Sequence, residues 1–114
     1  MIPKYIIGDI VMYDNKIHTI MDTLGVNNYE LSYISHPVHQ LELSGVPLTA
    51  DILEKNRWKK DDRGYDFRDI IFLNKDDFGG WVVGIGKDYI LTIASIHQLQ
   101  HLLFGLGLNS EMEV

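Results

Sequence analysis

The sequence predicts an α+β protein: an N-terminal β-meander, a short helix, an antiparallel sheet and a C-terminal amphipathic helix packed on that sheet. Short β-favouring runs alternate with tight-turn residues in both halves of the chain, and residues 96–106 carry apolar side chains at helical spacing. The 114 residues, 46% of them hydrophobic, suffice for one core. We therefore expect a single domain, 1–114, with subregions 1–45 and 46–114.

The opening meander begins with two β-favouring runs, residues 8–13 and 16–22. Asp14 and Asn15, which divide them, tolerate left-handed backbone and suit a tight hairpin. A third run, 29–34, places alternate side chains on one face, and the proline at position 37 then interrupts the ladder because it has no N–H to donate. Such strands predict a small curled sheet or an SH3-like small barrel, and their spacing does not distinguish closure from an open sheet.

The short helix is expected over residues 47–56. The Thr49 hydroxyl can cap its first turn, and Leu48 and Leu53 occupy the two positions of a hydrophobic staple. Asn56 can end the helix, because asparagine tolerates the left-handed conformation. A helix of about two turns is marginal alone, so its apolar residues must pack against the rest of the protein.

A second β region follows the short helix. Its strands are expected around Trp58 and at 65–67, 69–73, 81–85 and 89–93. Turn-rich segments separate them, at 61–64, 74–80 and 86–88. The pattern predicts an antiparallel sheet, and we expect the closing helix to cover one of its faces.

The C-terminal helix begins at Ser95, a favourable N-cap, and Gln98 completes a capping box. At 100° per residue an apolar stripe about 120° wide forms one side of the helix. This stripe consists of Ile96, Leu99, Leu102, Leu103 and Leu106. His97, His101 and Phe104 fall together on the opposite side, where we expect them to face outward.

Composition narrows the classes of function. The chain has no cysteine, which excludes disulfide scaffolds, thiolate metal sites and cysteine nucleophiles and suits the cytoplasm. Its formal net charge of −6 opposes binding to nucleic acid and to anionic membranes. The first residues lack the apolar run of a signal peptide, and polar residues interrupt the longest apolar stretch, 90–108, so we expect no membrane partner. No cofactor motif is present.

One alternative is a metal-binding or hydrolytic protein that uses His97 and His101. Their i, i+4 spacing lets two imidazoles reach one metal from a helix face. Gln98 stands where a zincin has its general base, and a zinc site needs a third ligand. The available third ligands are His18, His36, His39, Asp88 and Glu111. The competing interpretation is that both residues are ordinary surface histidines.

A second alternative is nucleic-acid binding through the segment Lys55 to Lys60. Four cations surround Trp58 there, a combination that can hold phosphates and stack a base. Asp61 and Asp62 follow at once and cancel part of that charge. The simpler interpretation is a solvated hairpin in which Trp58 belongs to the core.

Two stretches of this chain combine into one pattern: a P-L-T-x-x-I-L helix before a β region, and a terminal strand followed by an H-x-L-Q-x-L helix. Over about residues 46–108 this pattern resembles a family of small uncharacterised proteins from phages and prophage-like elements of Bacteroides-type gut bacteria. The matching positions are Pro47, Leu48, Thr49, Ile52, Leu53, His97, Leu99, Gln100 and Leu102. This chain departs from the pattern at Arg57 and Trp58, where family members often have glycine and phenylalanine, and at His101, where they frequently have asparagine.

The resemblance implies an origin in a mobile element and no established activity. The sequence contains no recognisable catalytic motif, so it favours a non-enzymatic interaction protein that acts by surface docking. The expected contact patch is His97, His101 and Phe104, because aromatic residues are enriched in interface cores. The partner would be another protein or a second copy of the chain.

Overall fold

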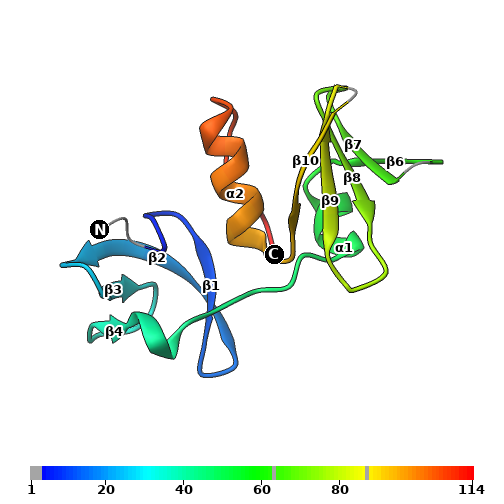
Figure 1. Ribbon diagram of the computed structural model, residues 1–114. Helices are drawn as coiled ribbons and strands as arrows, with labels where there is room; N and C mark the ends of the chain where they lie inside the picture. Colours follow the sequence, from blue (N-terminus) through cyan, green and yellow to red (C-terminus); the bar gives the residue numbers. More distant parts are fainter. Residues whose placement is uncertain (1–3, 63, 87) are drawn as a thin grey trace. The chain divides into compact units, whose positions relative to one another are not determined.

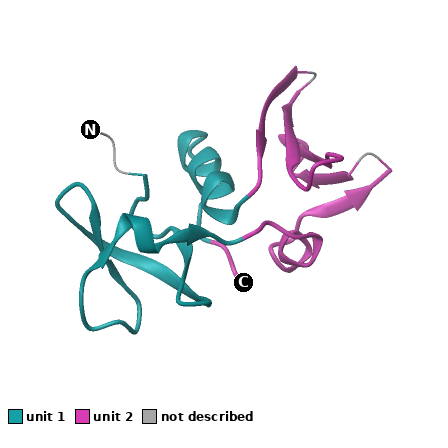
Figure 2. Cartoon of the chain, turned by 60° about the horizontal axis from the view of Figure 1, so that its bottom comes forward, with its two compact units in different colours: residues 1–46, 95–111 teal, residues 47–94, 112–114 magenta. Residues whose placement is uncertain are grey.

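A computed structural model describes residues 4–62, 64–86 and 88–114, and within these ranges the chain forms two five-stranded antiparallel sheets and two α-helices (Figure 1). The α+β class is therefore confirmed. The chain divides into two compact units, Met1–Val46 with Ser95–Glu111 (unit 1) and Pro47–Ala94 with Met112–Val114 (unit 2) (Figure 2). Among the described residues, no helix is both long and apolar enough to cross a membrane.

The sheet of unit 1 has the strand order β4-β3-β2-β1-β5. Its strands are β1 (Ile10–Tyr13), β2 (Lys16–Leu24), β3 (Asn28–Leu31), β4 (Val38–His39) and β5 (Ser44–Gly45), with a 3-10 turn, η1 (Gln40–Glu42), between the last two. The meander is confirmed. The strands β4 and β5 lie at opposite edges of the described sheet, so the SH3-like barrel is not closed.

The hairpin between β1 and β2 turns where the sequence predicted it, because Asp14 and Asn15 both take the left-handed conformation (φ 50° and 61°). The expected third strand is shorter than residues 29–34. Tyr33 has φ 63° and is fully exposed, so the chain leaves the sheet after Leu31. A left-handed tyrosine has no signature in the sequence, since this conformation favours glycine and asparagine.

The core of unit 1 forms on one side of its sheet and is closed by a tyrosine from the N-terminal segment. The fully buried Tyr5 ring meets the Tyr29 ring edge to face, with centroids 5.6 Å apart. The buried cluster consists of Tyr5, Val11, Ile20, Tyr29, Leu31, Val38 and Leu43. Burial of these side chains is the main source of stability for this unit.

Unit 2 begins with α1 (Ala50–Lys55), and the Thr49 hydroxyl accepts a hydrogen bond from Ile52 N–H at 3.3 Å, which confirms the predicted cap. The helix ends at Asn56, its C-cap residue, as predicted, but this asparagine is not left-handed. Asn56 has φ −95°, and Arg57 takes the left-handed position instead, with φ 68°. The Asn56 amide hydrogen-bonds both backbone groups of Glu113, at 2.8 Å each, so its side chain holds a nearby backbone segment.

The sheet of unit 2 is an antiparallel meander with the order β10-β9-β8-β7-β6, as predicted. Its strands are β6 (Lys59–Asp61), β7 (Gly64–Phe67), β8 (Ile71–Lys75), β9 (Trp81–Ile85) and β10 (Asp88–Ile93). Trp81 is buried, and its indole N–H donates to the Leu48 carbonyl at 2.8 Å. The expected turns at 61–64 and 86–88 include residues 63 and 87, which lie outside the described residues.

The C-terminal helix, α2 (Ile96–Gly105), belongs to unit 1. The sequence predicted it on the second sheet, whereas its polar side chains hydrogen-bond the segment that leads into β1. The Gln100 amide accepts from Ile10 N–H at 2.9 Å and donates to the Gly8 carbonyl at 2.9 Å and the Ser110 carbonyl at 3.1 Å. The carboxamide thus makes the hydrogen bonds to Gly8 and Ile10 that the backbone of a neighbouring strand would otherwise make.

The predicted start of α2 is confirmed, since Gln98 Oε1 accepts from Ser95 N–H at 3.0 Å. The apolar stripe is buried only in part. Ile96, Leu99 and Leu103 are buried, as the sequence predicted. Leu106 lies just beyond the last helical residue and is 42% exposed, so the buried stripe ends before it.

The hydrogen bonds of Gln100 provide a stability prediction. Gln100→Glu replaces the donor with a second carboxylate oxygen, which would face the carbonyls of Gly8 and Ser110 and leave a buried charge unpaired. We expect the free energy of unfolding to fall by roughly 2–4 kcal/mol, measured by urea denaturation at pH 7.5.

Gln98→Glu is the matched control, because it makes the same change on the same helix at an exposed residue and keeps the acceptor for Ser95 N–H. A carboxylate in the first helical turn is favourable, so this variant should be at least as stable as the wild type. Equal stability of both variants would contradict a structural role for Gln100.

Candidate functional site

The structure separates the three residues that the sequence placed on one outward helix face. Phe104 is 67% exposed and the His101 side chain is 36% exposed, whereas His97 is only 8% exposed. The expectation that His97 faces outward is therefore wrong. Its imidazole lies against the Tyr5 ring, with centroids 5.0 Å apart, because the N-terminal segment covers this part of α2.

His101 is held by a buried carboxylate. Its Nε2 lies 2.7 Å from Oδ2 of Asp9, and the same oxygen accepts a hydrogen bond from Ile6 N–H at 2.9 Å. Asp9 is 1% exposed. Burial raises the pKa of Asp9, and the hydrogen bonds from Ile6 and His101 oppose that rise. A carboxylate that orients a histidine occurs in many active sites, but it also serves to fix a helix in place.

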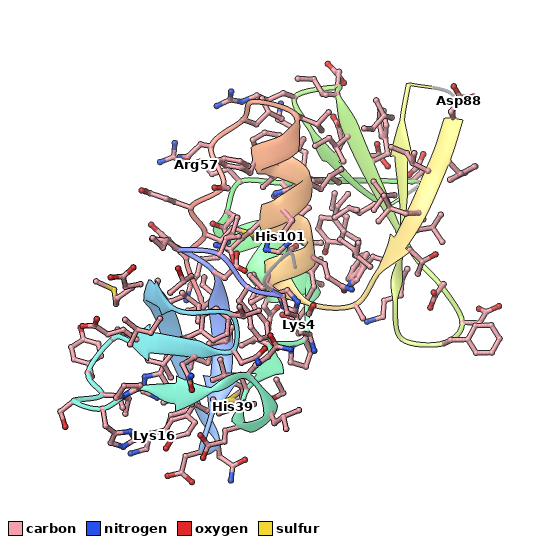
Figure 3. The ribbon with its side chains drawn as sticks, turned by 60° about the vertical axis from the view of Figure 1, so that its left-hand side comes forward. Lys4, Lys16, His39, Arg57, Asp88 and His101 are labelled. Carbon is pink, nitrogen blue, oxygen red and sulfur yellow. The ribbon has the colours of Figure 1, made fainter. Side chains whose placement is uncertain are left out.

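His97 belongs to a second, local set of polar contacts. Its Nδ1 lies 3.1 Å from the Ser95 hydroxyl, which itself lies 3.1 Å from Gln98 Oε1. Because the amide oxygen can only accept, the serine donates to Gln98 and receives the hydrogen of His97 Nδ1. Burial, with the charges of His101 and Lys4 (both labelled in Figure 3), lowers the pKa of His97 to about 4, so it is neutral at pH 7.

The residues around His97 are packed too closely to admit a substrate. A Cβ built on Gly45 would lie 2.7 Å from Ser95 Cβ and 3.0 Å from His97 Cε1, so only glycine fits at this position of β5. Ser95 is itself buried, at 8% exposure. The serine and histidine are therefore in contact, as in a nucleophile and its base, but the pair is closed off within the fold.

Two of the five candidate third ligands for a metal at His97 and His101 make other contacts. His18 Nδ1 lies 2.8 Å from the Ser32 carbonyl, and His39 Nδ1 accepts from Leu41 N–H at 3.1 Å. Across the described residues, no group of three or more histidine, cysteine, aspartate or glutamate side chains is placed to hold a metal ion.

The cationic segment Lys55 to Lys60 does not offer an aromatic ring to a ligand. Trp58 is 4% exposed, and its ring packs against Phe67 with centroids 5.0 Å apart. Lys59 and Lys60 lie in β6 with exposed side chains. The interpretation of Trp58 as a core residue is confirmed, and the base-stacking platform that the nucleic-acid alternative requires is not formed.

The most open apolar segment of unit 2 is one that the sequence predicted only as a strand. Three consecutive residues of β10 are exposed: Tyr89 at 72%, Ile90 at 51% and Leu91 at 42%. The strand β10 pairs with β9 on one side and is the edge of the sheet on the other. An edge strand presents unpaired N–H and C=O groups, so this edge combines free hydrogen-bonding groups with apolar side chains.

The other sheet edges carry features that discourage pairing. The strand β6 consists of Lys59, Lys60 and Asp61, all exposed and charged. The edges β4 and β5 of unit 1 have two residues each. In contrast, β10 has six residues, and Asp88 at its start is the only charged one (Figure 3). Charge, short length and bulges are the usual protections of sheet edges; β10 is longer than the other edges and has one charge, and its register with β9 is irregular between Tyr89 and Leu91.

The chain matches no protein-family model, no curated protein and no solved structure. The functional assignment therefore depends on the physical properties of the two candidate regions. The polar cluster around His97 is closed and is satisfied by contacts within unit 1. The strand β10 is the outermost strand of its sheet and carries exposed apolar side chains.

The lowered pKa of His97 predicts a loss of stability in mild acid. In the unfolded chain the His97 imidazole has its ordinary pKa of 6.5, whereas in the folded protein its pKa is about 4. The contribution of His97 to the free energy of unfolding is therefore complete above pH 6.5 and is lost as the pH falls toward 4. Between pH 7.5 and pH 5 we expect the free energy of unfolding to decrease by about 2 kcal/mol on this account. The raised pKa of Asp9 acts in the opposite direction.

The variant His97→Asn separates the two effects, because its amide can still reach the Ser95 hydroxyl but does not titrate. Urea denaturation at both pH values should show a smaller pH dependence in this variant than in the wild type. The exposed His36 provides the control, and His36→Asn should retain the wild-type dependence. The same pH dependence in all three proteins would show that His97 is not the titrating group.

Proposed function

We propose that this protein is a non-enzymatic docking protein that binds an extended segment of another polypeptide along the edge of β10. The observation that carries the proposal is the run Tyr89-Ile90-Leu91, exposed and apolar on an edge strand that lacks protective charge. The resemblance of residues 46–108 to small phage and prophage proteins supports a role in a phage or mobile element. Strand addition to a sheet edge is a recurrent mode of peptide recognition.

The two faces of β10 offer different contacts to an added strand. Tyr89 pairs with Gly84, which pairs with Phe72, so the tyrosine ring lies next to a position without a side chain. A Cβ at Gly84 would lie 3.7 Å from Tyr89 Cδ1, which is ordinary contact distance. Leu91 pairs with the buried Val83 and so projects from the core face of the sheet. Backbone hydrogen bonds would supply affinity, and these side chains would select apolar partners.

The contact patch expected from the sequence is reduced to Phe104 and part of His101. Phe104 remains a large exposed aromatic residue, and Leu106 beside it is 42% exposed. A helix surface of this kind binds through side chains alone, whereas β10 also offers backbone groups. The two surfaces therefore make different demands on a partner, and one experiment can compare them.

The proposal predicts the outcome of selecting a random seven-residue peptide display library against the purified protein. Enriched peptides should be rich in β-branched and aromatic residues, because they must bind as strands. Their binding, measured by fluorescence polarisation of synthetic peptides, should fall at least tenfold in Ile90→Lys, which places a charge on the docking edge. Phe104→Lys, with the same exposed apolar-to-lysine change on α2, should leave the affinity unchanged.

The comparison of these two variants decides between the surfaces. Loss of binding in Phe104→Lys alone would move the docking site to α2, where the sequence placed it. A library that yields no enriched peptide would contradict docking of an extended segment. Both variants change exposed side chains, so urea denaturation should confirm that they retain wild-type stability.

A further inference from the structure

We propose that the end of α1 is a second docking site, for an acidic extended segment of a partner protein, which residues 112–114 of this chain occupy in the partner's place. The proposal does not depend on docking at β10, and the site shares no residue with that strand. The observation that carries it is a set of three hydrogen bonds within unit 2, by which Lys55 and Asn56 hold the backbone of residues 113 and 114.

The carboxamide of Asn56 binds one residue of this segment as the backbone of a neighbouring strand would. Its oxygen accepts from Glu113 N–H at 2.8 Å, and its nitrogen donates to the Glu113 carbonyl at 2.8 Å. The amine of Lys55 donates to the next carbonyl, that of Val114, at 3.0 Å. We call Lys55 and Asn56 the α1 clamp. Because the clamp contacts backbone groups, an extended segment of another polypeptide can make the same three bonds.

The α1 clamp is oriented by its own helix rather than by the segment that it holds. An asparagine amide has two N–H donors. Besides its bond to Glu113, the Asn56 nitrogen donates to the Ile52 carbonyl at 2.7 Å, one turn back in α1. This second bond is local to the helix and does not require residues 112–114. A side chain already held in its binding geometry loses less conformational freedom when a ligand arrives, which favours binding.

The segment in the clamp is held in a way that permits exchange. The three hydrogen bonds lie at the surface, and the side chains of Glu113 and Val114 are exposed. Exposed hydrogen bonds add little net stability, because water competes for the same groups. A partner segment that makes these bonds and adds contacts of its own side chains would therefore displace residues 112–114.

Charge selects the class of partner. Residues 55–60 carry four exposed cations and no acidic residue. These cations are Lys55, Arg57, Lys59 and Lys60. Residues 111–114, in contrast, include two glutamates and no cation. The nearby Asp61 directs its Oδ1 to Gly64 N–H, at 3.1 Å, in its own hairpin. Complementary charge chiefly sets specificity and association rate, so the segment that competes for the clamp is expected to be acidic.

Occupation by residues of the same chain makes the site self-blocking. A segment tethered to the protein that it binds is present at an effective concentration in the millimolar range for a short linker. A free peptide with the same contacts must compete with that concentration. The wild-type chain should therefore bind such a peptide weakly, and a chain whose own segment cannot enter the clamp should bind it more tightly.

The test uses an amidated hexapeptide with the sequence of residues 109–114, titrated into the full-length 15N-labelled protein while the Asn56 side-chain amide is followed by NMR. In Glu113→Pro the proline has no N–H for the Asn56 oxygen, so the segment should leave a clamp that is itself unchanged. We expect this variant to bind the peptide at least roughly fivefold more tightly than the wild type. The matched control Glu113→Ala removes the same charge but keeps the N–H, so it should bind as the wild type does.

Further variants of Glu113→Pro locate the peptide. Adding Asn56→Ala should abolish binding, because both bonds to one residue of the peptide are lost. Adding Lys55→Met changes an exposed side chain and should weaken binding roughly threefold, which keeps the test decisive if Asn56→Ala disturbs the end of α1. Adding Ile90→Lys should leave binding unchanged. A peptide with lysine in place of both glutamates should bind roughly fivefold more weakly than the acidic one.

Several outcomes would overturn the proposal. Equal affinity in the wild type and both Glu113 variants would show that residues 112–114 do not block the clamp. No binding to Glu113→Pro, or binding that survives the changes at Lys55 and Asn56, would show that the clamp is not the docking site. Loss of binding in Ile90→Lys would move this peptide to β10. Equal binding of the acidic and lysine peptides would remove the acidic class of partner.

Discussion

The arrangement of unit 1 depends on the carboxamide of Gln100. Its oxygen accepts from Ile10 N–H and its nitrogen donates to Gly8 and Ser110 carbonyls, so three backbone groups that belong to no strand ladder are satisfied by one side chain. Buried backbone groups without partners are costly. The bonds to Gly8 and Ile10 join residues about ninety positions apart and fix α2 against the start of β1. The positions of Asp9 and His97 follow from that attachment.

The polar cluster of α2 is better explained by this attachment than by catalysis. Asp9 lies between the two residues that Gln100 holds, and its carboxylate is buried where His101 Nε2 can reach it. A buried carboxylate stabilises a structure only when its hydrogen bonds offset the loss of hydration, which gives it a role in selecting one arrangement of the helix. The close approach of Gly45 to Ser95 and His97 then removes the space that a substrate would need.

The sequence predicted the features that depend on neighbouring residues. The Thr49 cap, the left-handed pair Asp14 and Asn15, and the Gln98 capping box involve residues at most three positions apart, and all three are confirmed. It failed where a side chain serves a distant backbone. Asn56 looked like a left-handed terminator, but its amide binds Glu113 while Arg57 takes the left-handed conformation.

In both candidate sites, the decisive contacts join residues that are far apart in the sequence, and the sequence pattern does not indicate them. A 3.6-residue period indicates which helix residues share a face, but not that Tyr5 from the N-terminal segment covers His97. Similarly, the β-favouring composition of residues 89–93 predicts a strand without indicating whether neighbours lie on both sides of it. Edge position is a property of strand order, which long-range pairing decides. The sequence therefore directed attention to the histidines and left the edge of β10 unnoticed.

The bulge in β10 limits uncontrolled association through the apolar edge of this sheet. An edge of six regular apolar residues would be a template for open-ended pairing, and a bulge limits such pairing by twisting the strand locally. In β10 the irregularity falls between Tyr89 and Leu91, so only a short stretch remains available in regular register. The bulge would therefore keep the docking that we propose at this edge weak and reversible.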